Sequence, residues 1–271
     1  MMLVNGAPAD SLPVTDRGLA YGDGVFRTLR AVRGQPQHWP RHYAKLHNDC
    51  GALRLPCPAE SGLLADVRLA TAGYPHATVK IMVTRGSGPR GYAPPPPGVP
   101  TRIVMAEPSA PPPRHEHGII VRLCRLRLAH QPALAGIKHL NRLENVLARA
   151  EWSDSAVAEG LLLDQEGFAI GGTMSNLFII EAGVLITPDL SRCGVAGVTR
   201  ERVIDLAKQA GTVCRVEAIP YKRVLDADGA LLLNSLIGLW PIAKLEARAW
   251  APGVLARDIA QALEAADAAR D

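Results

Sequence analysis

Four prolines interrupt the chain between Glu107 and Gly118, in the segment EPSAPPPRHEHG. Proline fixes the backbone angle φ and lacks an N–H donor, so this segment is incompatible with a helix or with a central strand. The chain has 271 residues, of which 48% are hydrophobic, and this is enough for one large core or two moderate ones. We therefore predict two domains, over residues 1–107 and 118–271, joined by a proline-rich linker over residues 108–117.

The charge and hydropathy patterns argue against several classes of protein. Thirty basic and 26 acidic side chains give a net charge of +4 without a run of consecutive Lys or Arg, which argues against a nucleic-acid-binding protein. The longest apolar stretch, Gly229–Ala243, is shorter than the roughly 20 residues that span a bilayer and contains Asn234, Ser235 and Pro241. It predicts a buried strand region with a turn, not a membrane span.

The cysteines and the N-terminus predict a cytoplasmic protein. Five scattered cysteines are an odd number without a Cys-x-x-Cys pair, so we expect reduced core residues and neither a disulfide framework nor a zinc ribbon. The first residues, MMLVNGAPADS, lack the basic and apolar regions of a signal peptide. We expect no metal site, because the tempting cluster of His115, Glu116 and His117 lies in the proline-rich linker.

Hydrophobic spacing predicts a mixture of strands and helices without a regular βαβ alternation. The predicted strands cover residues 3–4, before an Asn-Gly turn, and 24–33, 78–84, 101–105, 119–126, 160–163, 176–180, 184–186, 213–218 and 230–233. The predicted helices cover residues 41–55, 61–72, 141–152, 199–210 and 256–269. We therefore predict an α+β chain, with a small N-terminal α/β domain and a larger C-terminal domain of mixed β-structure with helices, not a Rossmann or TIM fold.

Lys138 is the first candidate for chemistry, since the common nucleotide-binding, metalloprotease and hydrolase motifs are absent from the sequence. It follows an apolar Gly-Ile pair and precedes a predicted helix. Taken alone, this position is that of an ordinary lysine in a strand-to-helix loop. The functional alternative is a lysine that forms a Schiff base, whose amine must be partly desolvated to be nucleophilic near neutral pH.

Two glycine-bearing segments are the other candidates. In Gly194–Glu201 the glycines let the backbone come close to a ligand and Thr199 can cap the following helix, so free N–H groups could hold a phosphate. The same pattern also fits an ordinary N-cap. Gly171–Phe178 is small and polar before an apolar strand, which is also typical of a tight turn.

Taken together in this order, these segments resemble the fold-type IV pyridoxal-phosphate enzymes, the superfamily of branched-chain and D-amino-acid aminotransferases. The similar strings are DRGLAYGDGVFRT over residues 16–28, IKHLNRLE over 137–144, SNLF over 175–178 and GVTR over 197–200. Within the superfamily, IKHLNRLE and the string RGSGPRGY over 85–92 are most similar to the 4-amino-4-deoxychorismate lyases. The resemblance runs from about Leu3 to about Ile242.

The resemblance implies a lyase that converts 4-amino-4-deoxychorismate to 4-aminobenzoate and pyruvate, a step towards folate. Lys138 would bind pyridoxal 5′-phosphate covalently and then act as general base on the amine-bearing ring carbon of the substrate. Aromatisation would make elimination, instead of transamination, the outcome. The residues implied to hold the cofactor are Lys138, Lys45, Asn176, Val198, Thr199 and Ser235, and Lys45 stands where family members commonly have an arginine.

The substrate carries two carboxylates, which need cations and hydrogen-bond donors near the cofactor ring. The residues implied to bind it are Arg85, Arg90 and Tyr92 in RGSGPRGY, Arg102 on the following strand, expected to face the same region, and Asn141 and Arg142 beside the lysine. Each of these arginines could also be an ordinary solvated side chain, and the last two residues could merely cap a helix.

Gly171 departs from the family pattern. In resembling enzymes a glutamate at this place pairs with the pyridine nitrogen of the cofactor and keeps it protonated. Ile170, Gly171 and Gly172 offer no such side chain. We predict that a water replaces the carboxylate, because aromatisation lets this elimination tolerate a weaker electron sink. Gly171→Glu should then raise transamination relative to elimination.

Two other functions remain open from the sequence. The first is a D-amino-acid or branched-chain aminotransferase, which would share Lys138 and the phosphate-binding segment. The second is a non-catalytic protein that binds pyridoxal phosphate, suggested by the departures at Gly171 and Lys45. The resemblance also implies a homodimer with sites near the subunit interface.

Overall fold

Two compact units make up the chain in the computed structural model, which describes residues 1–96, 98–111, 115–251 and 253–268. The N-terminal unit comprises Met1–Pro111 and Ile137–Asn141, and the C-terminal unit comprises Pro112–Gly136 and Arg142–Asp271. The predicted linker over 108–117 spans this boundary, and its residues 112–114 lie outside the described part of the chain.

Ile137–Asn141 groups with the N-terminal unit, whereas we expected it in the C-terminal domain. Phe26 N–H donates to Lys138 C=O at 2.9 Å, and Leu140 N–H donates to Gly24 C=O at 2.9 Å. The segment therefore satisfies its backbone groups on a strand of the N-terminal unit, more than 100 residues earlier in the chain. A local sequence pattern does not reveal such a long-range pairing.

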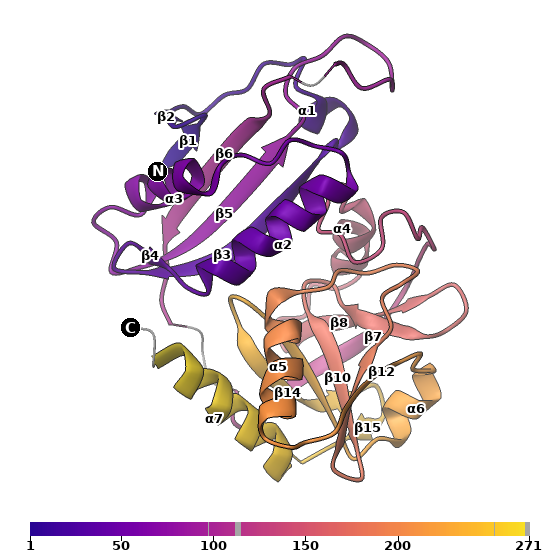
Figure 1. The fold of residues 1–271 in the computed structure, drawn as a ribbon. Coiled ribbons are helices and arrows are strands. Elements are labelled where there is room, and N and C mark those ends of the chain that lie inside the picture. Colours follow the sequence, from indigo (N-terminus) through magenta and orange to yellow (C-terminus); the bar gives the residue numbers. More distant parts are fainter. Residues whose placement is uncertain (97, 112–114, 252, 269–271) are drawn as a thin grey trace. The chain divides into compact units, whose positions relative to one another are not determined.

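The N-terminal unit is an antiparallel sheet with helices α2 and α3 against one face (Figure 1). Its strands run in the order β2-β1-β6-β5-β3-β4, and every neighbouring pair is antiparallel. The strands are β1 (Met2–Val4), β2 (Ala7–Pro8), β3 (Gly24–Val32), β4 (Gln35–Pro36), β5 (His76–Thr84) and β6 (Thr101–Pro108). The helices are α1 (Arg17–Tyr21), α2 (Trp39–Ala52) and α3 (Glu60–Ala70).

Strand β3 shows how the sequence builds this layer. Successive side chains of a strand point to opposite faces, so Val25, Arg27 and Leu29 are buried while Phe26 and Thr28 lie on the other, half-buried face. The buried face joins the apolar core beneath α2 and α3. Arg27 is the one charged residue of β3 at such a core position, and its partner belongs to the candidate site described below.

The C-terminal unit is a mixed β-barrel with helices. The strand order β12-β11-β10-β13-β14-β7-β8-β9 closes on itself because β9 also pairs with β10, and β15 pairs with β14. Strand β7 runs parallel to β8 and β14, and β11 runs parallel to β12. The strands are β7 (Ile119–Leu128), β8 (Val157–Asp164), β9 (Ala169–Gly172), β10 (Asn176–Glu181), β11 (Val184–Pro188), β12 (Cys214–Glu217), β13 (Gly229–Asn234), β14 (Gly238–Leu245) and β15 (Arg248–Ala249). The helices are α4 (Leu143–Arg149), α5 (Val198–Gln209), α6 (Tyr221–Asp226) and α7 (Val254–Ala268).

The predicted α+β class is confirmed, and most elements appear where the sequence pattern placed them. The helices predicted over 41–55 and 61–72 are α2 and α3, and the strand region with a turn in Gly229–Ala243 is the hairpin of β13 and β14. The short helices α1 and α6 and the short strand β9 were not expected. The terminal helix is α7, and its predicted last residue, Ala269, lies outside the described residues.

Helix α4 is shorter than the helix predicted over 141–152, and its apolar face is exposed. It begins at Leu143 and ends at Arg149. Leu143, Val146 and Leu147 share one face, as their spacing predicts, but each is more than half exposed. In a single copy of the chain this apolar face is therefore in contact with water.

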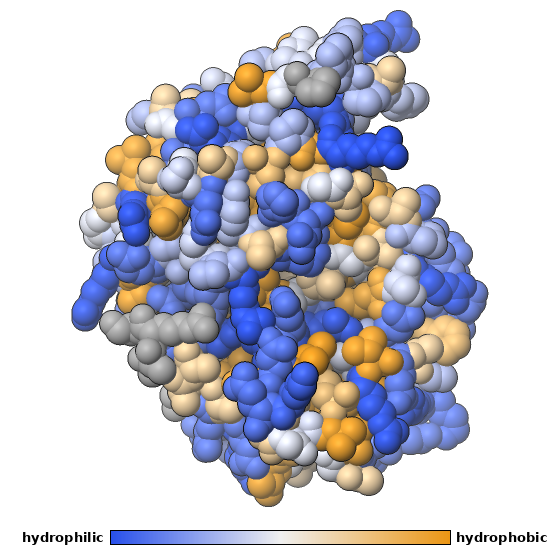
Figure 2. Space-filling view, viewed as in Figure 1, coloured by the Kyte–Doolittle hydropathy of each residue, from blue (hydrophilic) through white to orange (hydrophobic). Residues whose placement is uncertain are grey.

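Figure 2 shows hydrophilic residues over much of the visible surface of both units, with apolar residues scattered between them. The large apolar clusters lie inside each unit. Within the described ranges, no helix is long and apolar enough to cross a membrane. All five cysteines are free thiols, and Cys50, Cys124 and Cys193 are buried.

Candidate active site

Lys138 lies on a backbone that is held from both sides. Its N–H donates to Asp49 Oδ2 at 3.0 Å, and its C=O accepts from Phe26 N–H at 2.9 Å. Helix α2 and strand β3 therefore hold the same residue. The side chain is half-buried, and its Nζ lies 4.4 Å from the centre of the Phe26 ring. The amine is thus presented from a fixed backbone in a partly desolvated position, as a Schiff-base lysine requires.

A second amine lies over the same phenyl ring. Lys80 extends from β5, and its Nζ is 5.3 Å from the centre of the Phe26 ring. The sheet thus brings two primary amines, those of Lys138 and Lys80, to one aromatic side chain. Sequence reasoning missed Lys80. The signal was the alternation in HATVKIMVT, which places Lys80 with Thr78 and Met82 on the face opposite the core.

Asp49 is the centre of a buried charge cluster. Its carboxylate is ion-paired with Arg27 of β3 and with Lys45 of α2, and it also accepts the N–H of Lys138. Arg27 and Asp49 are each 2% exposed. Burial lowers the pKa of Arg27 to about 10, so the guanidinium remains charged at neutral pH. Its Nε is buried and has no hydrogen-bond partner in the described part of the chain.

The structure places Lys45, predicted to meet the cofactor phosphate, in this cluster. Two cations, Arg27 and Lys45, bind this one carboxylate, and Lys45 is the more exposed of the two. The contact of Lys45 with a phosphate stays a prediction. Sequence reasoning missed Asp49, although its position four residues after Lys45 is the spacing of an ion pair along a helix.

Asn141 is bound to the turn that follows α1. Its Nδ2 donates to Gly22 C=O at 3.1 Å. Gly22 has a φ of 64°, and a Cβ there would lie 2.3 Å from Asn141 Oδ1, so the turn and the contact both require glycine. Arg142 belongs to the C-terminal unit as the N-cap of α4, and burial lowers the pKa of its guanidinium. Their roles near a cofactor ring stay predictions.

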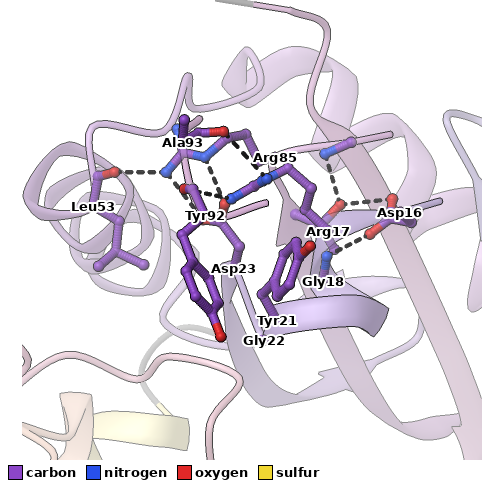
Figure 3. Close-up of polar contacts among 12 residues, drawn as sticks. Asp16, Arg17, Gly18, Tyr21, Gly22, Asp23, Leu53, Arg85, Tyr92 and Ala93 are labelled. Atoms are coloured by element: carbon purple, nitrogen blue, oxygen red, sulfur yellow. Dashed lines mark hydrogen bonds and ion pairs between the residues drawn. The ribbon is translucent and has the colours of Figure 1, made fainter. Parts of the chain in front are cut away.

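Arg85 is bound to other parts of the protein (Figure 3). Its Nε and Nη2 donate to the two oxygens of Asp23 at 2.8 and 3.0 Å. Its Nη2 and Nη1 also donate to the carbonyl groups of Leu53 and Arg54, just after α2, at 2.9 and 3.0 Å. Both ends of the guanidinium are therefore occupied, and this geometry favours a structural role over the expected contact with substrate.

Arg90 and Tyr92 lie exposed on the loop between β5 and β6. Arg102, which we expected to face the same region, instead points towards helix α3, where its Nε donates to Asp66 Oδ2 at 2.6 Å. The reason is the strand alternation, because Arg102 pairs across the sheet with Val83, whose side chain belongs to the helix-covered core. The structure therefore does not bring Arg102 together with Arg90 and Tyr92.

The start of α5 carries the predicted phosphate-binding residues of the C-terminal unit. Its N-cap is Gly197, not Thr199 as expected, and glycine has no side chain with which to cap the first turn. Thr199 Oγ1 lies 3.3 Å from Ser235 Oγ, so two hydroxyl groups meet beside the first turn. Helix N-terminal N–H groups attract anions, and hydroxyl groups add donors. The arrangement of Val198, Thr199 and Ser235 therefore suits a phosphate.

Asn176 holds the loop that leads into α5. Its Nδ2 donates to Val195 C=O at 2.7 Å, and its Oδ1 accepts from Gly197 N–H at 3.2 Å. The side-chain amide is thus engaged at both ends and sets the position of the helix N-terminus. A direct contact between Asn176 and the cofactor stays a prediction.

The turn after Gly171 is tightly closed. A Cβ at Gly171 would lie 2.7 Å from the Ser175 carbonyl oxygen, so any side chain there requires a backbone shift. Glu159 of β8 is fully buried beside this turn. It accepts from the N–H groups of Thr173 and Met174 at 3.1 and 3.2 Å and from Ser175 Oγ at 2.9 Å. This carboxylate therefore serves the turn itself.

Comparisons with known proteins agree on one family. The chain matches the amino-transferase class IV family over residues 24–245. It is 36% identical over 251 residues to aminodeoxychorismate lyase of Vibrio harveyi, covering 91% of this chain and 92% of that protein. It is 33% identical to a putative branched-chain-amino-acid aminotransferase of Methanocaldococcus jannaschii, covering 87% and 83%. The crystal structure of 4-amino-4-deoxychorismate lyase from Pseudomonas aeruginosa is similar with a TM-score of 0.93, at 42% identity and 98% coverage of both chains.

Proposed function

The chain belongs to the class IV aminotransferase family, and on that premise we propose that it is a pyridoxal-phosphate-dependent lyase that converts 4-amino-4-deoxychorismate to 4-aminobenzoate and pyruvate. A structurally similar branched-chain amino acid aminotransferase has been solved with pyridoxamine 5′-phosphate, which supports a cofactor of this kind. The observation that carries the choice of reaction is the likeness to the Pseudomonas aeruginosa lyase, at 42% identity over nearly the whole of both chains. When bound, the cofactor supplies a ring that withdraws electrons from the substrate carbon bearing the amine.

Lys138 supplies the two functions that the chain itself must provide. Its amine would hold the cofactor, and the same Nζ would act as the base that removes the proton from the amine-bearing ring carbon of the substrate. Both steps need the amine at one place, and the hydrogen bonds of the Lys138 backbone to Asp49 and Phe26 keep it there. The C–O bond to the enolpyruvyl group then breaks, its electron pair leaves with the oxygen, and the ring becomes aromatic. The enol takes up a proton on carbon to give pyruvate.

The phosphate of the cofactor is assigned to the start of α5. The N–H groups of the first turn of α5 would donate to it together with the hydroxyl groups of Thr199 and Ser235. In the N-terminal unit, Lys45, the more exposed cation of the Asp49 cluster, is proposed as a further cation for this phosphate.

The two carboxylates of the substrate are assigned to side chains of the N-terminal unit. Lys80 shares the Phe26 ring with Lys138, so it is placed to meet a carboxylate of a substrate whose reacting carbon lies beside the Lys138 amine. Arg90 and Tyr92 are exposed on their loop and offer a guanidinium and a hydroxyl group. Arg85 and Arg102 are left out of this assignment because their guanidinium groups bind Asp23 and Asp66.

A product assay tests the proposal. The purified protein with pyridoxal phosphate should release pyruvate and 4-aminobenzoate in equal amounts from 4-amino-4-deoxychorismate, without any amino acceptor. Pyruvate is followed by coupling to lactate dehydrogenase and 4-aminobenzoate by chromatography. Absence of both products at saturating cofactor would contradict the lyase. Turnover would in turn exclude a non-catalytic cofactor-binding protein.

The second candidate, an aminotransferase, is favoured by the 33% identity to the putative aminotransferase of Methanocaldococcus jannaschii. Incubation with D-alanine or a branched-chain amino acid and 2-oxoglutarate measures it through the glutamate formed. Faster glutamate formation than pyruvate release would favour this candidate.

A substitution at Gly171 tests what decides between elimination and transamination. The ratio of transamination to elimination should rise in Gly171→Glu. Because any Cβ at this position meets the Ser175 carbonyl group, Gly171→Ala is the necessary control for the backbone shift. An equal ratio in the Glu and Ala variants would show that the missing carboxylate does not decide the reaction.

We also propose that the enzyme works as a homodimer in the cytosol. The exposed apolar face of α4 and the family resemblance support the dimer, and five free thiols are consistent with a reducing compartment. Sedimentation velocity of the protein with cofactor should give twice the mass of one chain. A monomer at micromolar concentration would contradict the dimer.

A further inference from the structure

The loop that follows β5 presents Arg90 and Tyr92 but has little regular structure of its own. Between Arg85 and Pro100 its sequence is rich in glycine and proline, and no helix or strand forms in its described residues. Main-chain contacts hold its beginning, where Arg17 N–H donates to Gly86 C=O at 2.9 Å. The conformation further along must come from side chains that bind the backbone of the loop.

Arg17, the first residue of α1, reaches this later part (Figure 3). Its Nη1 donates to Gly91 C=O at 2.9 Å and its Nη2 donates to Tyr92 C=O at 3.1 Å, with a longer contact to Ala93 C=O at 3.5 Å. The Arg17 side chain is 4% exposed. A buried guanidinium whose donors end on consecutive carbonyl groups fixes the backbone, because releasing either group leaves a charged donor without a partner.

Tyr21, at the other end of α1, holds the same stretch. Its hydroxyl group accepts from Gly91 N–H at 2.9 Å, and its ring meets the Tyr92 ring edge-on with 5.5 Å between the centres. The guanidinium of Arg17 lies over the Tyr21 ring, 4.8 Å from its centre. Gly91 is therefore bound through both its N–H and its C=O group.

Asp23 completes this set, and we call Arg17, Tyr21 and Asp23 the loop clamp. The Asp23 carboxylate accepts from Arg17 Nε at 2.9 Å and from Arg85 Nε at 2.8 Å. Burial alone would raise the pKa of Asp23, but the hydrogen bonds from Arg85 and Arg17 outweigh it and hold the pKa below its usual value. The ionised carboxylate orients Arg17 so that its remaining donors face the loop.

We propose that Arg17 is a positioning residue for substrate binding, which directs Arg90 and Tyr92 to the dicarboxylate substrate by fixing the backbone of Gly91–Ala93. The proposal rests on the proposed function, in which Arg90 and Tyr92 contact the substrate. Arg17 does not touch the substrate itself, because it is buried and its donors end on Asp23 and on the loop. Its loss therefore acts on the affinity for substrate and leaves the attachment of the cofactor at Lys138 unchanged.

Steady-state kinetics of Arg17→Lys test this role. Lysine keeps a cation beside Asp23 but lacks the planar fork that donates to two carbonyl groups at once. We expect KM for the substrate to rise roughly tenfold, kcat to change less than about threefold, and the affinity for pyridoxal phosphate to stay the same. Arg223→Lys is the control, since Arg223 is likewise an arginine whose guanidinium donates to more than one partner, here Glu181 and Glu217 in the C-terminal unit. It should leave KM unchanged.

A double-mutant cycle shows whether Arg17 acts through the loop. Arg90→Ala removes a proposed substrate contact and should itself raise KM. If Arg17 works by directing Arg90 and Tyr92, the rise in Arg17→Lys/Arg90→Ala should be clearly smaller than the product of the two single effects. A fully multiplicative rise would mean that Arg17 acts by another route and would overturn the proposal.

Limited proteolysis measures the clamp without cofactor or substrate. Trypsin can cut after the exposed Arg90, and the clamp holds Gly91 on the other side of that bond. We expect cleavage after Arg90 to be several-fold faster in Arg17→Lys and, to a smaller extent, in Tyr21→Phe, which loses one hydrogen bond. Mass spectrometry of the fragments identifies the site. Unchanged cleavage in both variants would overturn the proposal.

The two failures are distinguishable. If the wild-type protein releases no pyruvate from 4-amino-4-deoxychorismate, the proposed function fails, and the substrate named here fails with it. If the lyase is active but Arg17→Lys has the KM of the wild type, only the positioning role of Arg17 is wrong.

Discussion

Two aspartates of the N-terminal unit each bind two cations, but the two clusters differ in burial and in what else they hold. Asp23 binds two arginines whose other donors end on carbonyl groups of the loop after β5 and of the residues after α2. Asp49 binds Arg27 and Lys45, accepts the N–H of Lys138, and is 2% exposed, against 16% for the Asp23 side chain.

The Asp23 cluster holds loop backbone in place, whereas the Asp49 cluster neutralises a charged side chain that is buried in the core. Around Asp23 the donors satisfy backbone groups that no helix or sheet serves, so losing one bond loosens a loop. Around Asp49 the Arg27 guanidinium lies in the core with its Nε unpartnered among the described residues, so losing the carboxylate leaves an uncompensated buried charge. Removing the carboxylate of Asp23 should therefore affect mainly the loop, whereas removing that of Asp49 should lower the stability of the whole unit.

Lys138→Ala should give the largest effect on activity. Without the amine, neither attachment of the cofactor nor proton removal is possible, so lyase turnover should fall by on the order of a thousandfold or more. The backbone bonds of residue 138 to Asp49 and Phe26 do not involve the side chain, so the Asp49 cluster and the fold should persist. Turnover, circular dichroism and urea unfolding measure these together. More than trace lyase activity would contradict the role of Lys138.

Asp49→Asn should give the largest effect on stability. It removes the charged partner of Arg27, and breaking a buried ion pair from one side costs about 3–5 kcal/mol. The matched variant Asp23→Asn should cost about 1 kcal/mol, since its arginines keep their carbonyl partners and Asp23 itself is more exposed than Asp49. Urea unfolding of both variants at pH 7 gives the two free energies. Equal losses of unfolding free energy in the two variants would contradict the difference that we infer between the Asp49 and Asp23 clusters.

Arg27→Met should cost less than Asp49→Asn, although it removes the other half of the same pair. The Asp49 carboxylate keeps Lys45 and the N–H of Lys138 as partners, whereas methionine fills a core position without a charge. We expect a loss of about 1–2 kcal/mol in the free energy of unfolding, by the same urea measurement. A loss as large as that of Asp49→Asn would show that Arg27, and not Asp49, is the centre of the cluster.

Local sequence patterns predicted the layers of the fold but not its long-range pairings. The strands predicted over 24–33 and 78–84 are β3 and β5, and in β3 the structure puts Arg27 on the same face as Val25 and Leu29. Its partner Asp49 lies 22 residues away on a helix, which no strand pattern reveals. The helix predicted to start at Asn141 begins later because the Asn141 side chain binds the turn at Gly22.

In the candidate site, too, short sequence segments indicated some residues, whereas the partners of others became apparent only in the structure. Family strings made Lys138 and the start of α5 candidates, because the chemistry proposed for them depends on residue type within a short segment, and their roles stay predictions. Arg85 looked equivalent to Arg90 in the sequence, since both are arginines of one loop. The structure separates them through Asp23, which is 62 residues from Arg85 in the chain. Burial and partners of a charged side chain are set by tertiary contacts, so they could not be read from RGSGPRGY alone.

The smallest predicted effect is a pH dependence of the loop clamp. The pKa of Asp23 is lower in the folded protein than its usual value, because the hydrogen bonds from Arg85 and Arg17 outweigh the effect of burial. A lowered carboxyl pKa stabilises the fold fully above the unfolded pKa, about 3.9, and this contribution is lost as the pH falls through the lower folded pKa. The free energy of unfolding of the wild type should therefore exceed that of Asp23→Asn by a constant amount, on the order of 1 kcal/mol, from pH 8 to about pH 5.

Below about pH 4 this difference should shrink, because the unfolded chain takes up the proton more readily than the folded one. Urea unfolding of both proteins at pH 7, 5, 4 and 3.5 measures it. Asp10→Asn, at an exposed position, is the control for removing one acidic group, and its difference from the wild type should stay near zero throughout. A gap between wild type and Asp23→Asn that grows on acidification would mean that the protonated side chain is the form that the clamp holds. Arg17 and Arg85 would then have to rely on the carbonyl groups of the loop and of the residues after α2, and Asp23 would not be a charged partner for them as Asp49 is for Arg27.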